Sequence, residues 1–177
     1  QRGEAYADAL ADAQSRGFAE ADPTLDVSGR DAAEKLAILA SLAYGVRVDP
    51  DQVACRGIDR LALDDIRFGA ELGYDVKLLA MAERCEGEDA LGLRTEPCFI
   101  HRREPLAQVH GSFNALSVYG TAVGHTLYLG PGAGRMPTAS AVVSDVLNVA
   151  AGWYPAAFAS MGLWPDAGSE PAAVCDD

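Results

Sequence analysis

In the first third of the chain, apolar residues recur every three or four positions, the period of an amphipathic α-helix. Residues 3–16 are predicted to form one such helix, and a glycine follows directly, as is common where helices end. Residues 29–44 form a second predicted helix that is apolar on most of its faces, so we expect it to lie at the centre of the domain. A shorter helical run covers residues 65–72.

After Tyr74 the period shortens towards two, which is typical of strands. The predicted strands cover residues 75–83, 91–102, 113–119 and 125–129. Pro97 has no N–H group to donate, so its part of the second strand is predicted to lie at a sheet edge or a bulge. A last helix is predicted over 138–151. This order indicates an α+β fold: a sheet of at least four strands, mixed or antiparallel, with helices packed on one face.

The length of 177 residues suits one domain with a substantial core. We assign residues 1–151 to that domain and residues 152–177 to a C-terminal tail rich in aromatic residues, glycine and proline. The tail has too few apolar residues for a membrane anchor, and we expect it to dock on the parent domain or on a second subunit. Because the chain starts at Gln1, without Met and inside a helical pattern, we expect it to be a piece of a longer protein.

The formal net charge of −12 argues against nucleic acid and anionic membrane surfaces as partners. It also disfavours binding of dinucleotide phosphates unless a local positive site or another domain supplies the contacts. No apolar stretch approaches the roughly 20 residues of a membrane span, and no signal-peptide pattern is present.

The four cysteines show neither a C-x-x-C motif nor the Cys/His spacing of a metal site. Four thiols in a chain of this length do not form a disulfide scaffold, so we expect free thiols, a reducing cytoplasm and no metal. The three histidines are separated from one another along the sequence, and we interpret them as strand-edge or loop residues.

The stretch 20–35 places four acidic residues ahead of one lysine. They are Glu20, Asp22, Asp26 and Asp31, and the lysine is Lys35. Pro23 restricts the preceding residue to extended backbone and fixes its own φ, so the first half of the stretch is predicted to be a non-helical loop. Ser28 is predicted to cap a helix on which Asp31 and Lys35, four residues apart, share one face.

Two interpretations of this stretch stay open on the residues alone. In the structural one, a solvated acidic loop leads into a capped helix that carries an ordinary surface salt bridge. In the functional one, the carboxylates bind a cationic, hydroxylated ligand and Lys35 transfers a proton. Crowding against apolar helix residues would favour the neutral amine that such a transfer requires.

A glycine-rich loop at residues 130–134 lies between a predicted strand and a predicted helix, where phosphate-binding loops also lie. It has neither the G-x-G-x-x-G spacing nor the Lys-Ser/Thr pair of a P-loop. The pattern alone therefore favours a tight turn in which two backbone segments approach closely.

The 20–39 segment resembles the substrate-site signature of the homoserine dehydrogenases. Other stretches support the resemblance in the same order along the chain: 6–14, 70–80, 105–109, 111–115 and 132–145. The resemblance covers roughly residues 4–151. It implies an oxidoreductase that interconverts L-homoserine and L-aspartate 4-semialdehyde with NADP or NAD, in the cytoplasm, on the route to threonine, methionine and isoleucine.

The resemblance also implies roles for individual residues. Glu20 would bind the amino end of the substrate, and Asp26 and Asp31 would bind or orient the substrate and the lysine. Lys35 would be the proton donor and acceptor at the reacting oxygen. In the glycine-rich loop and the helix after it, Gly134 and Thr138 would lie against the nicotinamide end of the cofactor.

The family's nucleotide-binding half and its cation site do not lie in these 177 residues, so the resemblance implies the substrate and dimerisation part of a homodimer. The cofactor would be bound mainly by a domain outside the chain, and no metal is assigned. Two alternatives stay open: an amino-acid-binding or dimerisation module without catalysis of its own, and a purely structural α+β domain.

Overall fold

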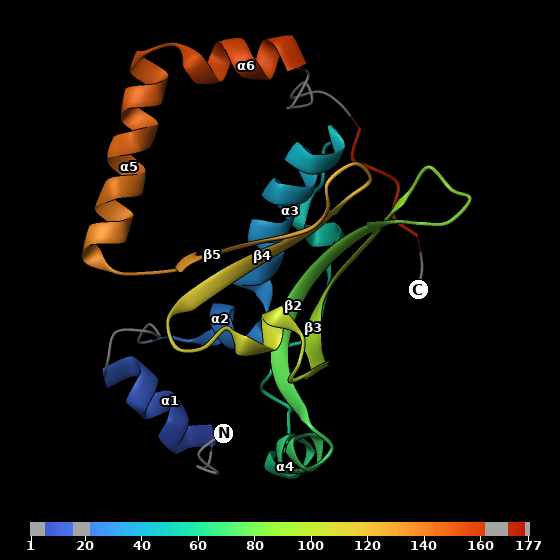
Figure 1. Ribbon diagram of the computed structural model, residues 1–177, viewed down its shortest axis with the longest axis vertical. Coiled ribbons are helices and arrows are strands. Elements are labelled where there is room, and N and C mark those ends of the chain that lie inside the picture. The colour runs from blue at the N-terminus through green and yellow to red at the C-terminus, as the bar shows by residue number, and fades with distance from the viewer. Residues whose placement is uncertain (1–5, 16–21, 162–169, 176–177) are drawn as a thin grey trace. The chain divides into compact units, whose positions relative to one another are not determined.

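The computed structural model describes residues 6–15, 22–161 and 170–175, drawn as coloured ribbon in Figure 1. The chain divides into two compact units. Unit 1 comprises residues 1–21, 61–77 and 98–147, and unit 2 comprises residues 22–60, 78–97 and 148–177.

Unit 2 is built around a long helix that covers a small sheet. Its helices are α2 (Thr24–Ser28), α3 (Arg30–Tyr44) and α6 (Trp153–Met161), with a 3-10 turn η1 at Pro50–Gln52. The three-stranded sheet has the order β1-β3-β2, where β1 is Ala54–Cys55, β2 is Tyr74–Arg84 and β3 is Leu91–His101. Residues 78–84 of β2 and 91–97 of β3 belong to unit 2, and the rest of both strands belongs to unit 1. Figure 1 shows α3 running alongside β2 and β3, in agreement with their shared core.

The core of unit 2 forms where α3 meets β3. Its buried members are Ala33, Leu36, Ala37, Ala40, Val48, Val53, Leu91 and Leu93. The alanines recur at three- and four-residue spacing on one face of α3, and their small side chains let the helix approach the sheet closely. Ile38 and Leu39 are 54% and 41% exposed, so burial of α3 is confined to one face, in contrast to the burial on most faces that its composition predicted.

The parallel pairing of β1 with β3 explains how a proline fits into the central strand. β1 has only two residues, and it pairs Ala54 with Arg94 and Cys55 with Thr95. Pro97 lies beyond that register, where β3 has no β1 residue beside it, so its missing N–H breaks no ladder hydrogen bond on that side.

Unit 1 contains α1 (Tyr6–Ser15), α4 (Leu63–Glu71), a 3-10 turn η2 (Pro105–Gln108) and most of α5 (Arg135–Ala150). Its sheet is the antiparallel hairpin of β4 (Phe113–Gly120) and β5 (Gly124–Pro131), paired from Phe113–Pro131 to Gly120–Gly124. Helix α4 packs closely on Phe99, because a Cβ at Gly69 would lie 2.5 Å from the Phe99 ring.

The predicted α+β class is confirmed, and each predicted strand is found within a few residues of its expected bounds. Within the described residues the five strands form sheets of three and two, whereas the sequence suggested one sheet of at least four. Periodicity identifies a strand but not its pairing partners, which explains the difference. Helix α6 lies in the predicted tail and was missed because its own apolar residues show no clear helical period.

Residues 170–175 lie against the start of β3 and carry a disulfide to the end of β2. Isolated bridges join Arg47 to Pro171 and Leu91 to Val174. Cys85 and Cys175 are bonded, 90 positions apart in the sequence. The prediction that these thiols are free is therefore wrong, because spacing along the sequence carries no information about so distant a contact.

Among the helices that the structure describes, none combines the length and apolar character needed to cross a membrane.

Candidate functional site

Within the acidic stretch, residues 24–28 fold into a short helix instead of the predicted loop. α2 begins at Thr24, directly after Pro23. The proline restricts Asp22, which precedes it, and leaves the following residues free to become helical. The Asp22 carboxylate accepts hydrogen bonds from the hydroxyl of Thr24 at 2.5 Å and from its N–H at 3.1 Å. These two bonds hold the pKa of Asp22 below its ordinary value.

Gly29 joins α2 to α3 and takes the role that the sequence predicted for Ser28. Its φ of 82° lies in the left-handed region, where a side chain is strained. Ser28 is the last residue of α2, and its hydroxyl accepts the N–H of Arg30 at 3.4 Å. The glycine therefore ends one helix and starts the next, which fixes the direction in which α3 leaves the acidic stretch.

A second glycine holds the loop after β1 against α2. A Cβ at Gly57 would lie 2.2 Å from the carbonyl oxygen of Val27, and the N–H of Ile58 donates to that same oxygen at 2.8 Å. Backbone therefore packs directly on backbone here. Sequence reasoning missed this contact, since an isolated glycine in a loop is too weak a signal to indicate it.

Asp31 and Lys35 form the predicted ion pair on α3, with a hydrogen bond from Nζ to Oδ2. Their side chains are 42% and 63% exposed. The expected crowding of Lys35 by apolar residues is therefore absent, because the buried positions of α3 lie on the face toward the core and Lys35 lies outside that face. The pair presents a cation and an anion together at an accessible surface.

Arg30, one position before this pair, ties the start of α3 to η1. Its guanidinium donates to Asp51 at 2.5 Å and to Glu34 at 3.4 Å. The hydrogen bond to Asp51 is the main cause that raises the pKa of Arg30. Arg30 and Asp51 were not among the predicted site residues, since only the folded chain brings together positions that are 21 apart.

The structure brings together only some of the predicted site residues. Asp26 on α2 is exposed and shares unit 2 with Asp31 and Lys35. Glu20 lies outside the described residues. In unit 1, Gly134 has φ 126° and its carbonyl accepts the N–H of Thr138 at 3.0 Å, so both belong to the first turn of α5.

In the glycine loop before α5, the predicted close approach is found at Gly132, whereas a Cβ at Gly130 would meet nothing within 4 Å. A Cβ at Gly132 would lie 2.2 Å from the amide nitrogen of Asn114, and the Gly132 N–H donates to the carbonyl of Ser112 at 2.9 Å. No acidic side chain lies in the first turn of α5. No carboxylate of that first turn therefore repels a polar or anionic group at the helix start.

Over residues 6–15, 22–161 and 170–175, no three His, Cys, Asp or Glu side chains gather so as to hold a metal ion. His125 contacts the hydroxyl of Ser117 at 2.8 Å and stacks on Tyr119, with 4.3 Å between ring centroids.

The carboxylates and the lysine of unit 2 have a chemistry of their own. The carboxylates can hold an ammonium group, and Lys35 can donate a proton.

The family model for homoserine dehydrogenase matches residues 1–147. The chain is 48% identical to the homoserine dehydrogenase of Bacillus subtilis over 144 residues, which are 81% of this chain and 33% of that protein. It is 49% identical to the homoserine dehydrogenase of Synechocystis over 146 residues, 81% of this chain and 34% of that protein. The chain thus spans about a third of the length of the curated relatives it matches.

Solved structures give the same picture. The chain superposes on a homoserine dehydrogenase from Thiobacillus denitrificans with a TM-score of 0.79 and 47% identity, over 84% of this chain and 34% of that one. It also matches a hyperthermophilic archaeal homoserine dehydrogenase mutant in complex with NADPH, with a TM-score of 0.64 and 28% identity, over 82% of this chain and 40% of that one. The acidic stretch, the Asp31–Lys35 pair and the glycine loop all lie within the matched residues, and the chain belongs to the homoserine dehydrogenase family.

Proposed function

We propose that this chain is the substrate-binding and dimerisation part of an enzyme that interconverts L-homoserine and L-aspartate 4-semialdehyde. The observation that carries the proposal is the Asp31–Lys35 pair, exposed on α3 inside the residues that match the family. The pair has the composition that the reaction requires: a cation that can give up a proton and a carboxylate that orients it.

Lys35 is the proton donor and acceptor in this proposal. When the aldehyde is reduced, negative charge develops on its oxygen, and a protonated Lys35 stabilises that charge and then transfers its proton to form the hydroxyl. In the reverse direction the neutral amine takes the hydroxyl proton. Asp31 holds the lysine side chain in position through their hydrogen bond, so the Nζ atom is already in place before the reaction begins.

Carboxylates on the segment before α3 bind the substrate. L-Homoserine carries an ammonium group, which forms charge-assisted hydrogen bonds with carboxylates. Asp26 is exposed on α2 and free of any salt bridge to Lys35, whose partner is Asp31. We assign substrate binding to Asp26, with Glu20 at the amino group and Asp31 shared between substrate and lysine.

A nicotinamide cofactor, NADP or NAD, supplies or accepts the hydride when it is bound. Gly134 and Thr138 would lie against it from this chain, and a domain outside the chain would hold most of it. The residues fit that assignment: the loop is glycine-rich, α5 begins without an acidic side chain, and residues 131–136 are exposed.

A second copy of the chain is the proposed partner. The β4–β5 hairpin exposes large apolar side chains on both faces, among them Phe113, Leu116, Tyr119, Tyr128 and Leu129. A two-stranded sheet is marginal in water unless another layer covers it. A homodimer in which hairpins contribute to a shared interface would bury this surface.

The test uses the intact gene product and L-homoserine, with NADP⁺ and NAD⁺ supplied separately. We expect reduced cofactor to form with L-homoserine and not with L-serine, whose hydroxyl is one carbon closer to the ammonium group. Asp26→Asn should raise KM more than it lowers kcat, because it weakens binding of the ammonium group. No homoserine-dependent turnover by the folded protein with either cofactor would favour the amino-acid-binding or dimerisation module instead.

A further inference from the structure

The segment at residues 170–175 is docked on unit 2 by backbone hydrogen bonds. The N–H of Ala172 donates to the carbonyl of Arg47 at 2.7 Å. On the other side, the N–H of Leu91 donates to Ala173 at 2.9 Å and the N–H of Cys175 donates to Leu91 at 3.3 Å. The segment therefore adds a short stretch of pairing to the start of β3.

The same segment covers part of the core that supports α3. Ala172 packs against the buried cluster, together with Tyr44 and Val46. The side-chain amide of Gln52 donates to the carbonyl of Ala172 at 2.8 Å. If the segment left this position, the core below the C-terminal half of α3 would lose a covering layer. The carbonyl of Arg47 and the N–H and carbonyl of Leu91 would also lose their hydrogen-bond partners.

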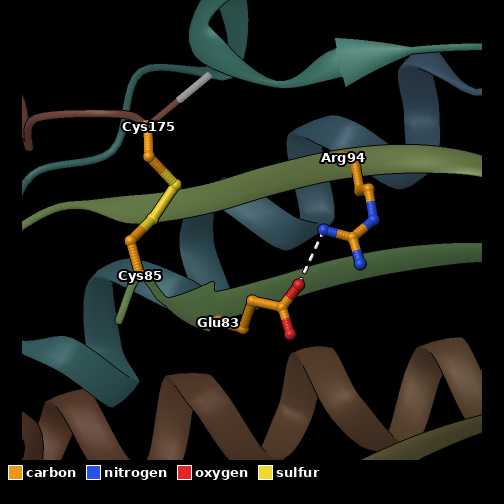
Figure 2. Close-up of a disulfide and its surroundings, with 4 residues drawn as sticks. All are labelled: Glu83, Cys85, Arg94 and Cys175. Atoms are coloured by element: carbon orange, nitrogen blue, oxygen red, sulfur yellow. Dashed lines mark hydrogen bonds and ion pairs between the residues drawn. A yellow bond between two sulfur atoms is a disulfide. The ribbon is translucent and has the colours of Figure 1, made fainter. Parts of the chain in front are cut away.

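A disulfide links this segment to the sheet, as Figure 2 shows. Cys85 follows the last residue of β2, and Cys175 comes from the docked segment, with 6.6 Å between their Cα atoms. Gly92 lies beneath the bond, because a Cβ there would be 3.7 Å from the sulfur of Cys175. The neighbouring Glu83–Arg94 ion pair, at 2.7 Å, bridges β2 and β3 beside the sulfurs.

The bond has the features of one that can open and close. Both cysteines are partly exposed, so small thiols can reach them. The backbone hydrogen bonds do not depend on the disulfide, so they would keep the two thiols adjacent after reduction. The bond closes a span of 90 positions, so forming it removes much of the chain entropy of the unfolded protein, and reduction gives that entropy back.

We propose that Cys85 and Cys175 form a redox-operated clamp that sets how firmly residues 170–175 are held on unit 2. Closure consumes a low-molecular-weight disulfide. One cysteine thiolate attacks it and releases one thiolate, and the other cysteine then attacks the mixed disulfide and releases the second. The protein's two thiols are thereby oxidised to a disulfide, and the small disulfide is reduced to two thiols. The proposal is independent of the reaction proposed above.

The test equilibrates the full-length protein in mixtures of reduced and oxidised glutathione at several ratios. Peptide mass spectrometry without reductant measures the fraction of Cys85 linked to Cys175, and hydrogen exchange measures the amides of Ala172 and Cys175. We expect the linked fraction to follow the glutathione ratio reversibly. Exchange at the two amides should slow by about tenfold or more on closure, because local opening of the segment becomes rarer.

Two variants make the comparison specific. Cys175→Ser should remove the dependence of exchange on glutathione, while Cys55→Ser, which changes a cysteine outside the disulfide, should leave it intact. If Cys175→Ser fails to fold, wild-type protein reduced with a phosphine provides the open state. A link that never forms, a link that glutathione cannot reverse, or equal exchange in the linked and reduced protein would each overturn the proposal.

Discussion

At the scale of single residues, the site depends on a few close contacts around the α2–α3 junction. Gly29 adopts φ 82° and Gly57 packs against the backbone of Val27, so both positions require the absence of a side chain. The i,i+4 spacing was enough to predict the Asp31–Lys35 pair from the sequence. The contacts of Gly57 and the Arg30–Asp51 bond could not be predicted, because they join positions whose proximity only the tertiary fold creates.

Thr95, below this junction, offers a test of the packing. It is fully buried, and its hydroxyl oxygen has no hydrogen-bond partner among the described residues. Thr95→Val keeps the shape and removes an unsatisfied polar group, so we expect the free energy of unfolding to stay the same or rise by about 1 kcal/mol. Chemical denaturation of the folded protein measures this change.

Thr95→Ala is the matched control, because it removes the methyl group of Thr95 as well as the hydroxyl. That methyl group packs close to Gly29, since a Cβ at Gly29 would lie 3.0 Å from it. We expect it to lower the free energy of unfolding by about 1 kcal/mol or more. If Thr95→Val instead destabilises the protein as much as Thr95→Ala, the hydroxyl has a partner and this account of the junction is wrong.

At the scale of elements, strong periodicity predicted well and local exceptions did not. The long helix α3 and the strands β2 to β5 were found near their expected bounds. α2 was missed because Pro23 was taken to prevent helix on both sides, although it disfavours helical backbone only at the residue before it. The pairing of strands into two sheets was beyond reach, since register depends on contacts distant in sequence.

The start of α2 gives a prediction about pH. The two hydrogen bonds from Thr24 lower the pKa of Asp22 in the folded protein. Their contribution to stability is therefore fully present above the pKa that Asp22 has in the unfolded chain. It is lost as the pH falls through the lower, folded value. Thr24→Val removes the hydroxyl bond, and the pKa of Asp22 should move up towards its ordinary value, as followed by NMR titration of the carboxyl carbon.

The control for this titration is Thr126→Val in unit 1, whose hydroxyl donates to the carbonyl of Val118 at 3.3 Å. That variant should leave the titration of Asp22 unchanged. An unchanged Asp22 titration in Thr24→Val as well would mean that the hydroxyl bond does not persist in solution.

At the scale of the whole molecule, the exposed apolar surface of the β4–β5 hairpin points to association. Leu116 and Tyr128 lie opposite each other in its register and are 39% and 64% exposed. We expect light scattering to give twice the mass of one subunit for the intact protein. Leu116→Glu should shift that mass towards the monomer at the same concentration, because a charge would have to be buried in the interface.

Leu72→Glu serves as the comparison, since Leu72 is also an exposed leucine of unit 1 but is not on the hairpin. It should leave the mass unchanged. A monomeric wild-type protein, or a Leu116→Glu variant that associates as firmly as wild type, would show that the hairpin does not form the interface.

The central claim is that Lys35 moves the proton, and turnover of L-homoserine by variants of the intact protein tests it most directly. Lys35→Ala should lower kcat about 100-fold or more in a folded protein. Lys35→Arg should also be slow, because the guanidinium keeps its charge beside Asp31 but does not release its proton. Glu34→Ala, the adjacent exposed control on α3, should stay within about threefold of wild type. A folded Lys35→Ala variant that turns over L-homoserine as fast as wild type would contradict the account.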